Sequence, residues 1–368
     1  MPANERVIVG LSGGVDSSVA ALLLQRQGYK VEGLFMKNWE EDDSGEYCSA
    51  AADLADAQTV AEHLKIPLHT VNFSTEYWDR VFAYFLEEYG AGRTPNPDVL
   101  CNREIKFKAF LDHALDHLQA SHIATGHYAG VAHDSHGYHL LRARDDDKDQ
   151  TYFLYMLGQR PLQHTLFPLA RLSKQQVREI AQQAGFPNHK KKDSTGICFI
   201  GERKFRDFLQ RFLPAQPGNI VDPDGNLLGQ HQGLIYYTLG QRQGLGIGGR
   251  RDADESPWFV AAKDLPRNVL IAVQGHDHPM LMCRRLTANQ MHWVAGHPPL
   301  TPLSCLARIR HRQSLQSCNL EREDEQRYQV VFDSLQRAAT PGQSIVFYHN
   351  NRCLGGGIIE ETATLSKM

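Results

Sequence analysis

Residues 12–18 read SGGVDSS and directly follow the apolar run VIVGL at residues 7–11. A glycine-rich turn that leaves a strand and opens a helix predicts a phosphate cradle, because backbone amides at a helix N-terminus bind anions. The lysine that completes the common nucleotide loop GxxxxGK[ST] is absent, which disfavours the γ-phosphate chemistry of kinases and motors. The alternative is a tight turn without a ligand, but strand, SGGxDS and helix together favour the cradle. Asp16 inside an anion site requires a compensating cation or a positioning role.

The first half of the chain alternates strand and helix patterns around this loop. Strands are expected at residues 7–11, 30–37, 68–73 and 122–126, and helices at 19–27, 50–64, 78–89, 104–118 and 173–185. Repeated units of this kind predict an α/β fold with an N-terminal doubly wound parallel sheet, covered by helices on both faces. Ligands bind beyond the carboxyl ends of such strands, which is where SGGVDSS falls.

The character of the sequence changes near residue 210. Asp224-Gly225 predicts a hairpin turn, and a glycine-rich stretch follows at residues 244–250. Short alternating runs such as YQVVFD and QSIVFYHN, separated by glycine-rich turns, predict a small β-barrel near the C-terminus. We therefore expect a catalytic domain at residues 1–210, a small central linker module at 211–280 and a C-terminal β-barrel at 281–368.

Composition and charge limit the functional classes. A chain of 368 residues with no run of about 18 apolar residues predicts a multidomain protein without a membrane span. The N-terminus MPANERVIVG has no signal-peptide pattern, so we expect a cytoplasmic location. A net charge of −3 means that any nucleic acid must be met by local basic patches. The seven cysteines are scattered without a CxxC pair, which predicts neither a disulfide framework nor a zinc site.

SGGVDSS resembles the loop of the PP-loop ATP pyrophosphatases, enzymes of the adenine nucleotide alpha hydrolase-like fold that split ATP between its α and β phosphates. The resemblance implies that the loop residues bind the leaving pyrophosphate together with Mg²⁺. These residues are Gly10, Leu11, Ser12, Gly13, Gly14, Val15, Asp16 and Ser17. Met36 and Gly126, at the ends of two expected strands, would line the adenine and ribose of ATP. Core packing for Met36 and a tight turn for Gly126 are the simpler alternatives.

Two cysteines could supply sulfur chemistry. Cys101 is the last but one residue of the segment GRTPNPDVLCN at residues 92–102, just before an expected helix at Glu104, whose dipole would favour a thiolate. Cys198 follows three lysines in KKKDSTGICFI, and these could also stabilise a thiolate. A buried apolar cysteine and a solvated lysine run are the alternatives. For the remaining cysteines we expect ordinary burial.

The motifs SGGVDSS, FMKNW, TPNPDVLCN, ATGHY, DKDQTYFL and DSTGICFIGE occur in this order. Together they closely resemble the bacterial tRNA-specific 2-thiouridylase family, and the resemblance extends from residue 6 to residue 360. It implies a tRNA-uridine 2-sulfurtransferase that adenylates the C2 oxygen of the wobble uridine. Cys198 would carry a persulfide received from a sulfur-relay carrier protein or a cysteine desulfurase. Cys101 would release this sulfur while closing a transient Cys101–Cys198 disulfide, or would act as an acid or base.

The same resemblance implies the tRNA contacts. Asn96, Pro97 and Asp98 would face the flipped uridine, with Asp98 as its base or orienting group. The other expected contacts are His127, Lys148, Asp149, Gln150, Arg310, His311 and Gln343. An aromatic residue would be usual at the position of His311, which makes this contact a departure from the family pattern.

Three alternatives to 2-thiolation stay open. The first is another PP-loop adenylating synthetase, although no glutaminase pattern is present to supply ammonia. The second is an iron–sulfur-dependent tRNA thiolase with Cys101, Cys198 and Asp98 as cluster ligands. The third is a non-catalytic RNA-binding protein, against which the intact loop and both cysteines argue. The sequence does not choose between direct attack by the persulfide and attack by released sulfide.

Overall fold

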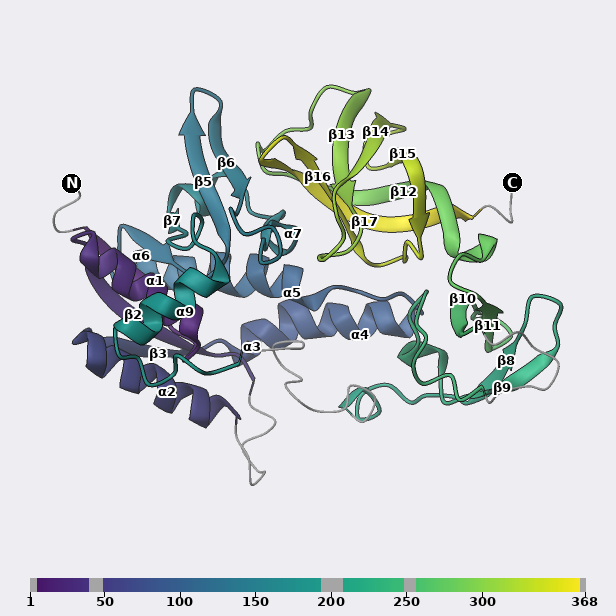
Figure 1. Ribbon diagram of the computed structural model, residues 1–368, viewed down its shortest axis with the longest axis horizontal. Helices are drawn as coiled ribbons and strands as arrows, with labels where there is room; N and C mark the ends of the chain where they lie inside the picture. The colour runs from purple at the N-terminus through teal and green to yellow at the C-terminus, as the bar shows by residue number, and fades with distance from the viewer. Residues whose placement is uncertain (1–4, 40–48, 193–207, 248–255, 365–368) are drawn as a thin grey trace.

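A parallel sheet forms the N-terminal part of the computed structural model, which describes residues 5–39, 49–192, 208–247 and 256–364 (Figure 1). Within these residues the strand order is β3-β2-β1-β4-β7, and neighbouring strands are parallel. The strands are β1 Arg6–Gly10, β2 Lys30–Lys37, β3 Leu68–Asn72, β4 His122–Ala124 and β7 Thr165–Leu166. The predicted parallel sheet is confirmed.

The sheet is apolar on both faces, as its layers require. Val7 and Val9 of β1 pack on one face against helices α1 Val15–Arg26, α2 Ser49–Leu64 and α9 Lys174–Gln183. Ile8 lies between them in the sequence and faces the opposite layer of helices. Because successive strand residues point to opposite faces, this continuous apolar run is buried on both sides.

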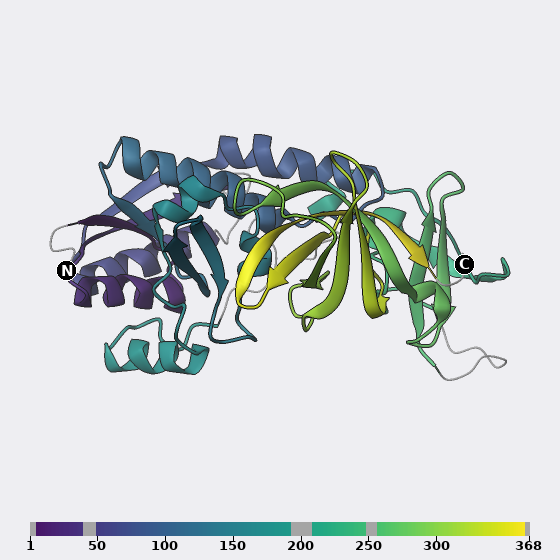
Figure 2. The same ribbon diagram turned by 90° about the horizontal axis from the view of Figure 1, so that it is seen from above.

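Two long helical stretches cover the second face, and the one that ends in α4 extends toward the central module (Figures 1 and 2). The first runs through α3 Ser74–Tyr77, the π-helix η1 Trp78–Phe82 and α4 Ala83–Gly90. The second runs through α5 Pro97–Leu100, the π-helix η2 Cys101–Ala109 and α6 Phe110–Asp116. It begins seven residues before the expected start at Glu104, since Pro97 at its first position presets the helical φ angle.

A hairpin that the sequence patterns did not reveal links the N-terminal domain to the barrel. Strands β5 Ala129–Asp134 and β6 Gly137–Arg142 pair with each other, and β6 also pairs with β17 of the barrel through Leu140 and Leu141. The short helices α7 Thr151–Leu154 and α8 Gln159–Gln163 follow the hairpin.

The remaining described strands form a central sheet and a barrel. The central sheet has the order β10-β11-β8-β9. Its strands are β8 Gly218–Val221, β9 Leu227–His231, β10 Trp258–Asp264 and β11 Val269–Gln274, accompanied by the 3₁₀ turn η3 Leu234–Tyr236. The predicted hairpin turn is confirmed, because Gly225 lies between β8 and β9 with φ +88°.

Pairing of its first and last strands closes the C-terminal barrel. The strands are β12 Met282–Trp293, β13 Leu303–Arg308, β14 Gln316–Arg322, β15 Tyr328–Arg337, β16 Ser344–His349 and β17 Arg352–Thr364, preceded by the turn η4 Pro279–Leu281. The predicted barrel is confirmed, whereas the limits 1–210, 211–280 and 281–368 stay a prediction. No helix in the described ranges is long and apolar enough to span a membrane.

Glu32 on β2 joins three strands of the parallel sheet at the end opposite SGGVDSS. It is only 4% exposed, and its carboxylate accepts hydrogen bonds from Arg6 Nε at 2.8 Å and Arg6 Nη2 at 2.7 Å. His69 Nε2 lies 2.8 Å from the same carboxylate. The Arg6 guanidinium, with a smaller contribution from His69, holds the pKa of Glu32 below its ordinary value.

We expect Glu32→Gln to destabilise the N-terminal domain at neutral pH by roughly 2 kcal/mol, because Arg6 loses its charged partner. A carboxylate with a depressed folded pKa stabilises the fold above its unfolded pKa, and this contribution is lost as the pH falls through the folded pKa. The stability gap between wild type and variant should therefore begin to narrow below about pH 4.5 and disappear once the pH lies below the folded pKa. Urea unfolding at a series of pH values measures it, and a gap that does not change with pH would contradict the assignment.

Candidate functional site

The SGGVDSS loop is braced from within by its own serines. Ser17 Oγ donates to the carbonyl oxygen of Gly14 at 3.1 Å and accepts from the backbone amide of Ser12 at 3.3 Å. Ser18 Oγ donates to the same Gly14 carbonyl at 2.8 Å. Gly13 has φ +71°, and a Cβ there would lie 2.5 Å from the carbonyl oxygen of Asp53. Only glycine therefore fits this position.

Asn188 braces the loop from outside, and sequence reasoning missed it. Its Nδ2 donates to the carbonyl oxygen of Gly13 and to Ser18 Oγ, both at 3.0 Å. The side chain is 7% exposed and comes from the turn that follows α9. Its own neighbours in the sequence gave no signal for this role.

The cation that Asp16 requires is Lys174, at the start of α9. Its Nζ lies 2.8 Å from each oxygen of the Asp16 carboxylate. The hydroxyl of Tyr128 also donates to Asp16 Oδ1 at 3.0 Å. The acidic residue within the loop is thus neutralised by a lysine 158 residues away, which no local pattern could identify.

The structure gathers the predicted ATP-binding residues at the carboxyl ends of β1, β2 and β4. A Cβ on Gly10 would lie 3.4 Å from Met36 Cε. A Cβ on Gly126 would lie 2.7 Å from the backbone nitrogen of Ser17, so the backbone at Gly126 touches the first turn of α1. Their contact with ATP stays a prediction, but their proximity to the loop is a property of the fold.

Two other parts of the chain, the barrel and the central sheet, hold the segment before Asn96. Gln343 of the barrel donates from Nε2 to the carbonyl oxygens of Thr94 at 2.7 Å and Pro95 at 3.2 Å. Lys263 of the central sheet donates to the carbonyl oxygen of Gly92 at 3.0 Å. We call residues 92–95 with these two partners the loop clamp. Gln343, predicted as a tRNA contact, thus positions the residues expected to face the uridine.

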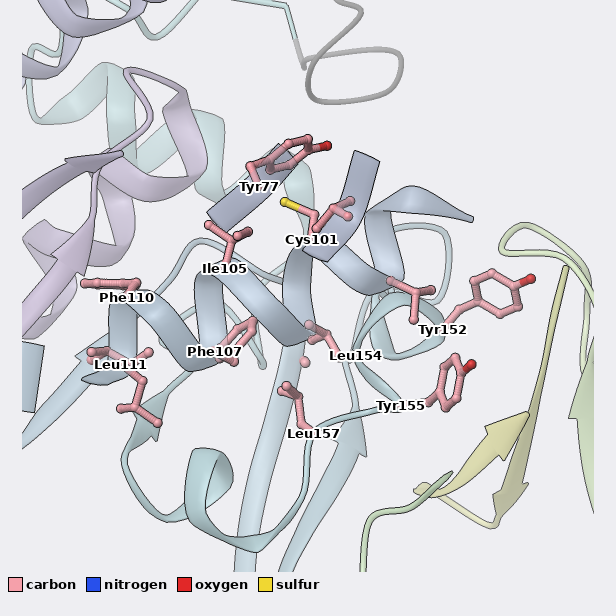
Figure 3. Close-up of a cluster of buried hydrophobic side chains, with 14 of the residues drawn as sticks. Tyr77, Cys101, Ile105, Phe107, Phe110, Leu111, Tyr152, Leu154, Tyr155 and Leu157 are labelled. Atoms are coloured by element: carbon pink, nitrogen blue, oxygen red, sulfur yellow. The ribbon is translucent and has the colours of Figure 1, made fainter. Parts of the chain in front are cut away.

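Cys101 is enclosed in the helical layer. It is 1% exposed and lies in the same apolar cluster as Tyr77 and Ile105 (Figure 3). The helix begins at Pro97, so Cys101 lies beyond the first turn, where the expected help from the helix dipole fades. Asp98 lies in that first turn. Cys198 lies outside the described residues.

Two of the predicted tRNA contacts are imidazoles held in apolar surroundings. Burial and the charge of Lys106 hold the pKa of His127 well below its ordinary value, so this ring is neutral at neutral pH. The ring of His311 lies 4.4 Å from that of Phe153, centroid to centroid. Its Nε2 lies 2.9 Å from the carbonyl oxygen of Asp149. The His311 ring therefore packs against Phe153 in the way that the aromatic residue expected at this position would.

The segment Lys148–Gln150 is tied to both the loop and the barrel. The backbone amide of Tyr128 donates to Gln150 Oε1 at 2.9 Å. Asp149 is 1% exposed, and its carboxylate lies 3.5 Å from the Arg308 guanidinium of the barrel. Arg310 donates to the carbonyl oxygens of Leu239 and Ala338. Direct tRNA contact by these residues stays a prediction.

Carboxylates near the loop could share a metal ion with a phosphate. Asp16 lies in the loop, and Asp53 and Asp56 lie behind Gly13, where both contact Lys191 Nζ. In the part of the chain that the structure describes, no group of three or more His, Cys, Asp and Glu side chains could hold a metal by itself.

Comparison with known proteins identifies the family. A tRNA-specific 2-thiouridylase MnmA of Alcanivorax borkumensis is 62% identical over 98% of this chain and 99% of its own length. The chain belongs to the tRNA-specific 2-thiouridylase MnmA family. An MnmA of Salmonella typhimurium is 60% identical over 98% of both chains.

Family models divide the MnmA-like chain into three segments. A tRNA methyl transferase HUP domain matches residues 5–202, a tRNA methyl transferase PRC-barrel domain residues 206–274, and an aminomethyltransferase β-barrel domain residues 283–359. A solved U34-tRNA thiolase NcsA from Methanococcus maripaludis is 16% identical with a TM-score of 0.32, covering 53% of this chain and 62% of its own. A similarity this low supports no assignment of function.

Gln343→Glu should loosen the loop clamp, because a carboxylate cannot donate to the two backbone carbonyls and repels them. We expect the amides of Arg93, Thr94 and Asn96 to exchange with solvent about 10-fold faster, a loss of about 1.4 kcal/mol of local stability. Hydrogen–deuterium exchange read by mass spectrometry measures this change in the protein without RNA.

Gln316→Glu is the matched control, because it makes the same charge change in the barrel while its amide bonds to Ser314. Unchanged exchange at residues 93–96 in Gln343→Glu, together with weaker tRNA binding, would instead assign Gln343 to direct RNA contact.

Proposed function

We propose that this chain is a tRNA-uridine 2-sulfurtransferase. It uses ATP to adenylate the C2 oxygen of the wobble uridine and then replaces that oxygen by sulfur, giving 2-thiouridine, AMP and pyrophosphate. The observation that carries the proposal is a braced PP-loop within a chain that matches MnmA relatives over 98% of its length. The TPNPDVLCN segment, whose first residues belong to the loop clamp, is the expected uridine site.

In the first reaction the loop binds the departing pyrophosphate. The amides of the first turn of α1 have no acceptor within the helix and can donate to phosphate oxygens. Gly126 touches this turn and Met36 adjoins Gly10, so ATP would extend from the loop across the ends of β1, β2 and β4. The proposed reaction requires the α-phosphorus to lie between the loop and the uridine site.

Magnesium fits this arrangement without a dedicated protein cage. Mg²⁺ is usually held by one or two carboxylates together with substrate phosphates and water. Asp16 is placed to contribute such a carboxylate, with Asp53 and Asp56 as further acceptors beside the loop. The ion would supply charge neutralisation for the phosphates.

Asn96, Pro97 and Asp98 would receive the uridine after it leaves the anticodon stack, as other base-modifying enzymes require. They lie at the start of the second helical stretch, directly after the loop clamp. A neutral His127 favours contact with a base over contact with a phosphate. Asp98 in the first helical turn would orient the uracil or accept its N3 proton.

In the second reaction Cys198 would carry the sulfur as a persulfide. Its outer sulfur forms a bond with C2 as the bond from C2 to the adenylate oxygen breaks, and AMP leaves with the electron pair. Cys101 then attacks Cys198, which breaks the sulfur–sulfur bond and leaves 2-thiouridine and a Cys101–Cys198 disulfide. The variant in which Cys101 first releases sulfide ends in the same disulfide. A thiol reductant must reset the pair in either case.

An iron–sulfur-dependent thiolase is the second candidate, because Cys101 and Cys198 with Asp98 could ligate a cluster. Anaerobic purification followed by iron and sulfide determination separates the two mechanisms. A persulfide enzyme forms 2-thiouridine without iron, whereas a cluster enzyme loses activity with its iron.

The central test is incubation of the chain with ATP, a persulfide donor and tRNA, followed by nucleoside analysis. We expect 2-thiouridine from the wild type. Cys198→Ser should lose thiolation by at least about 100-fold and keep ATP-dependent adenylation of the tRNA, because the first reaction needs no thiol.

Cys283→Ala is the control for this test, since burial raises the pKa of the Cys283 thiol to about 11 and leaves it unreactive. Full thiolation by Cys198→Ser with a protein persulfide donor would overturn the persulfide assignment. Absence of 2-thiouridine from the wild type would overturn the proposed function itself.

A further inference from the structure

Lys174 lies at the mouth of the pyrophosphate loop although it is far from the loop in the sequence. Its Nζ contacts both oxygens of Asp16 at 2.8 Å, and its side chain is 13% exposed. Asp16 belongs to the first turn of α1, whose free amides point toward a bound anion. A lysine ammonium is therefore already present at the place where the PP-loop sequence lacks one.

The backbone of Lys174 is fixed independently of its contact with Asp16. Lys174 is the first residue of α9, and Ser173 caps this helix through a reciprocal pair of hydrogen bonds with Gln176. The backbone amide of Lys174 donates to Asp145 Oδ2 at 2.8 Å. Neither the helix cap nor the hydrogen bond to Asp145 involves the Lys174 side chain. The ammonium can therefore change its partner while the backbone of Lys174 stays in place.

The electrostatics of the loop require such a cation. Asp16 alone would repel a pyrophosphate bound to the same turn. Lys191 also lies beside the loop, but it faces two carboxylates, Asp53 at 2.8 Å and Asp56 at 2.5 Å. Lys174 instead has one carboxylate among its ion-pair partners, so its move to a phosphate would uncover one negative charge, where a move of Lys191 would uncover two.

We propose that Lys174 is a catalytic residue that binds the β and γ phosphates of ATP and stabilises the leaving pyrophosphate, and that Asp16 and Tyr128 hold it in place before ATP binds. This inference rests on the proposed function and adds a residue to its first reaction. Lys174 binds the outer phosphates as the lysine of a common nucleotide loop does, but it comes from helix α9 and not from the loop itself.

The chemical step is a displacement at the α-phosphorus. The bond between uridine O2 and the α-phosphorus forms as the bond from that phosphorus to the bridging oxygen of the β phosphate breaks. The electron pair stays on this oxygen, and the uracil N3 proton passes to a base. Lys174 transfers no proton; its positive charge acts on the charge that develops on pyrophosphate.

Binding of two products of the reaction tests this role. Inorganic pyrophosphate and AMP are titrated separately into the full chain in magnesium buffer by calorimetry. Lys174→Met should weaken pyrophosphate binding by at least about 10-fold and leave AMP binding within about 2-fold, because AMP lacks the groups that Lys174 contacts. Lys174→Arg keeps the charge and should retain pyrophosphate binding within about 5-fold.

Lys30→Met is the matched control, since it removes one positive charge at the opposite end of the same sheet. Unchanged pyrophosphate binding by Lys174→Met, or equal loss of AMP and pyrophosphate binding, would reduce Lys174 to a structural ion pair. The titrations use no tRNA. A negative result in them would overturn the role of Lys174 without bearing on whether the chain forms 2-thiouridine.

A measurement on the wild-type chain avoids any dependence on how the variants fold. Pyrophosphate should protect Lys174 from acetylation by acetic anhydride, read by mass spectrometry at that residue, and AMP should not. Equal labelling with and without pyrophosphate would overturn the proposal.

Discussion

A carboxylate in the mouth of an anion site is unstable without a cation, and the contact between Asp16 and Lys174 satisfies this requirement. The pair joins α1 to α9, which come from opposite ends of the N-terminal domain. Tyr128 ties the same carboxylate to the start of the β5–β6 hairpin, and Gln150 ties Tyr128 to the segment that contacts the barrel. The loop is thus connected through hydrogen bonds to the surfaces that are expected to meet tRNA.

The parts of the structure that local patterns determine could be predicted. The apolar run before SGGVDSS had to be a buried strand, and the glycines of the loop had to open a helix. Asp224-Gly225 formed its hairpin because two neighbouring residues define that turn. The α/β sheet and the C-terminal barrel followed from patterns of this kind.

Contacts between distant segments could not be predicted in the same way. The sequence indicated that Asp16 needs a cation, but only the packing of α9 on α1 selects Lys174. The role of Asn188 could not be predicted from the sequence either, since it depends on a hydrogen bond to the distant Gly13 carbonyl. Gln343 was expected to contact RNA, yet its amide faces the backbone of Thr94 and Pro95. The second helical stretch begins at Pro97, although a helix was expected only from Glu104.

The pairing of β6 with β17 has a consequence for the integrity of the chain. Strand β6 of the N-terminal domain pairs with β17 at the edge of the barrel. The sheet of the barrel therefore includes a strand from the N-terminal part of the sequence. A fragment that lacked the barrel would expose the backbone groups of β6, and a separate barrel would expose those of β17. Open strand edges of this kind recruit other chains into sheets. In the assembled protein each part covers the strand edge of the other where Leu140 and Leu141 pair with Cys353 and Arg352.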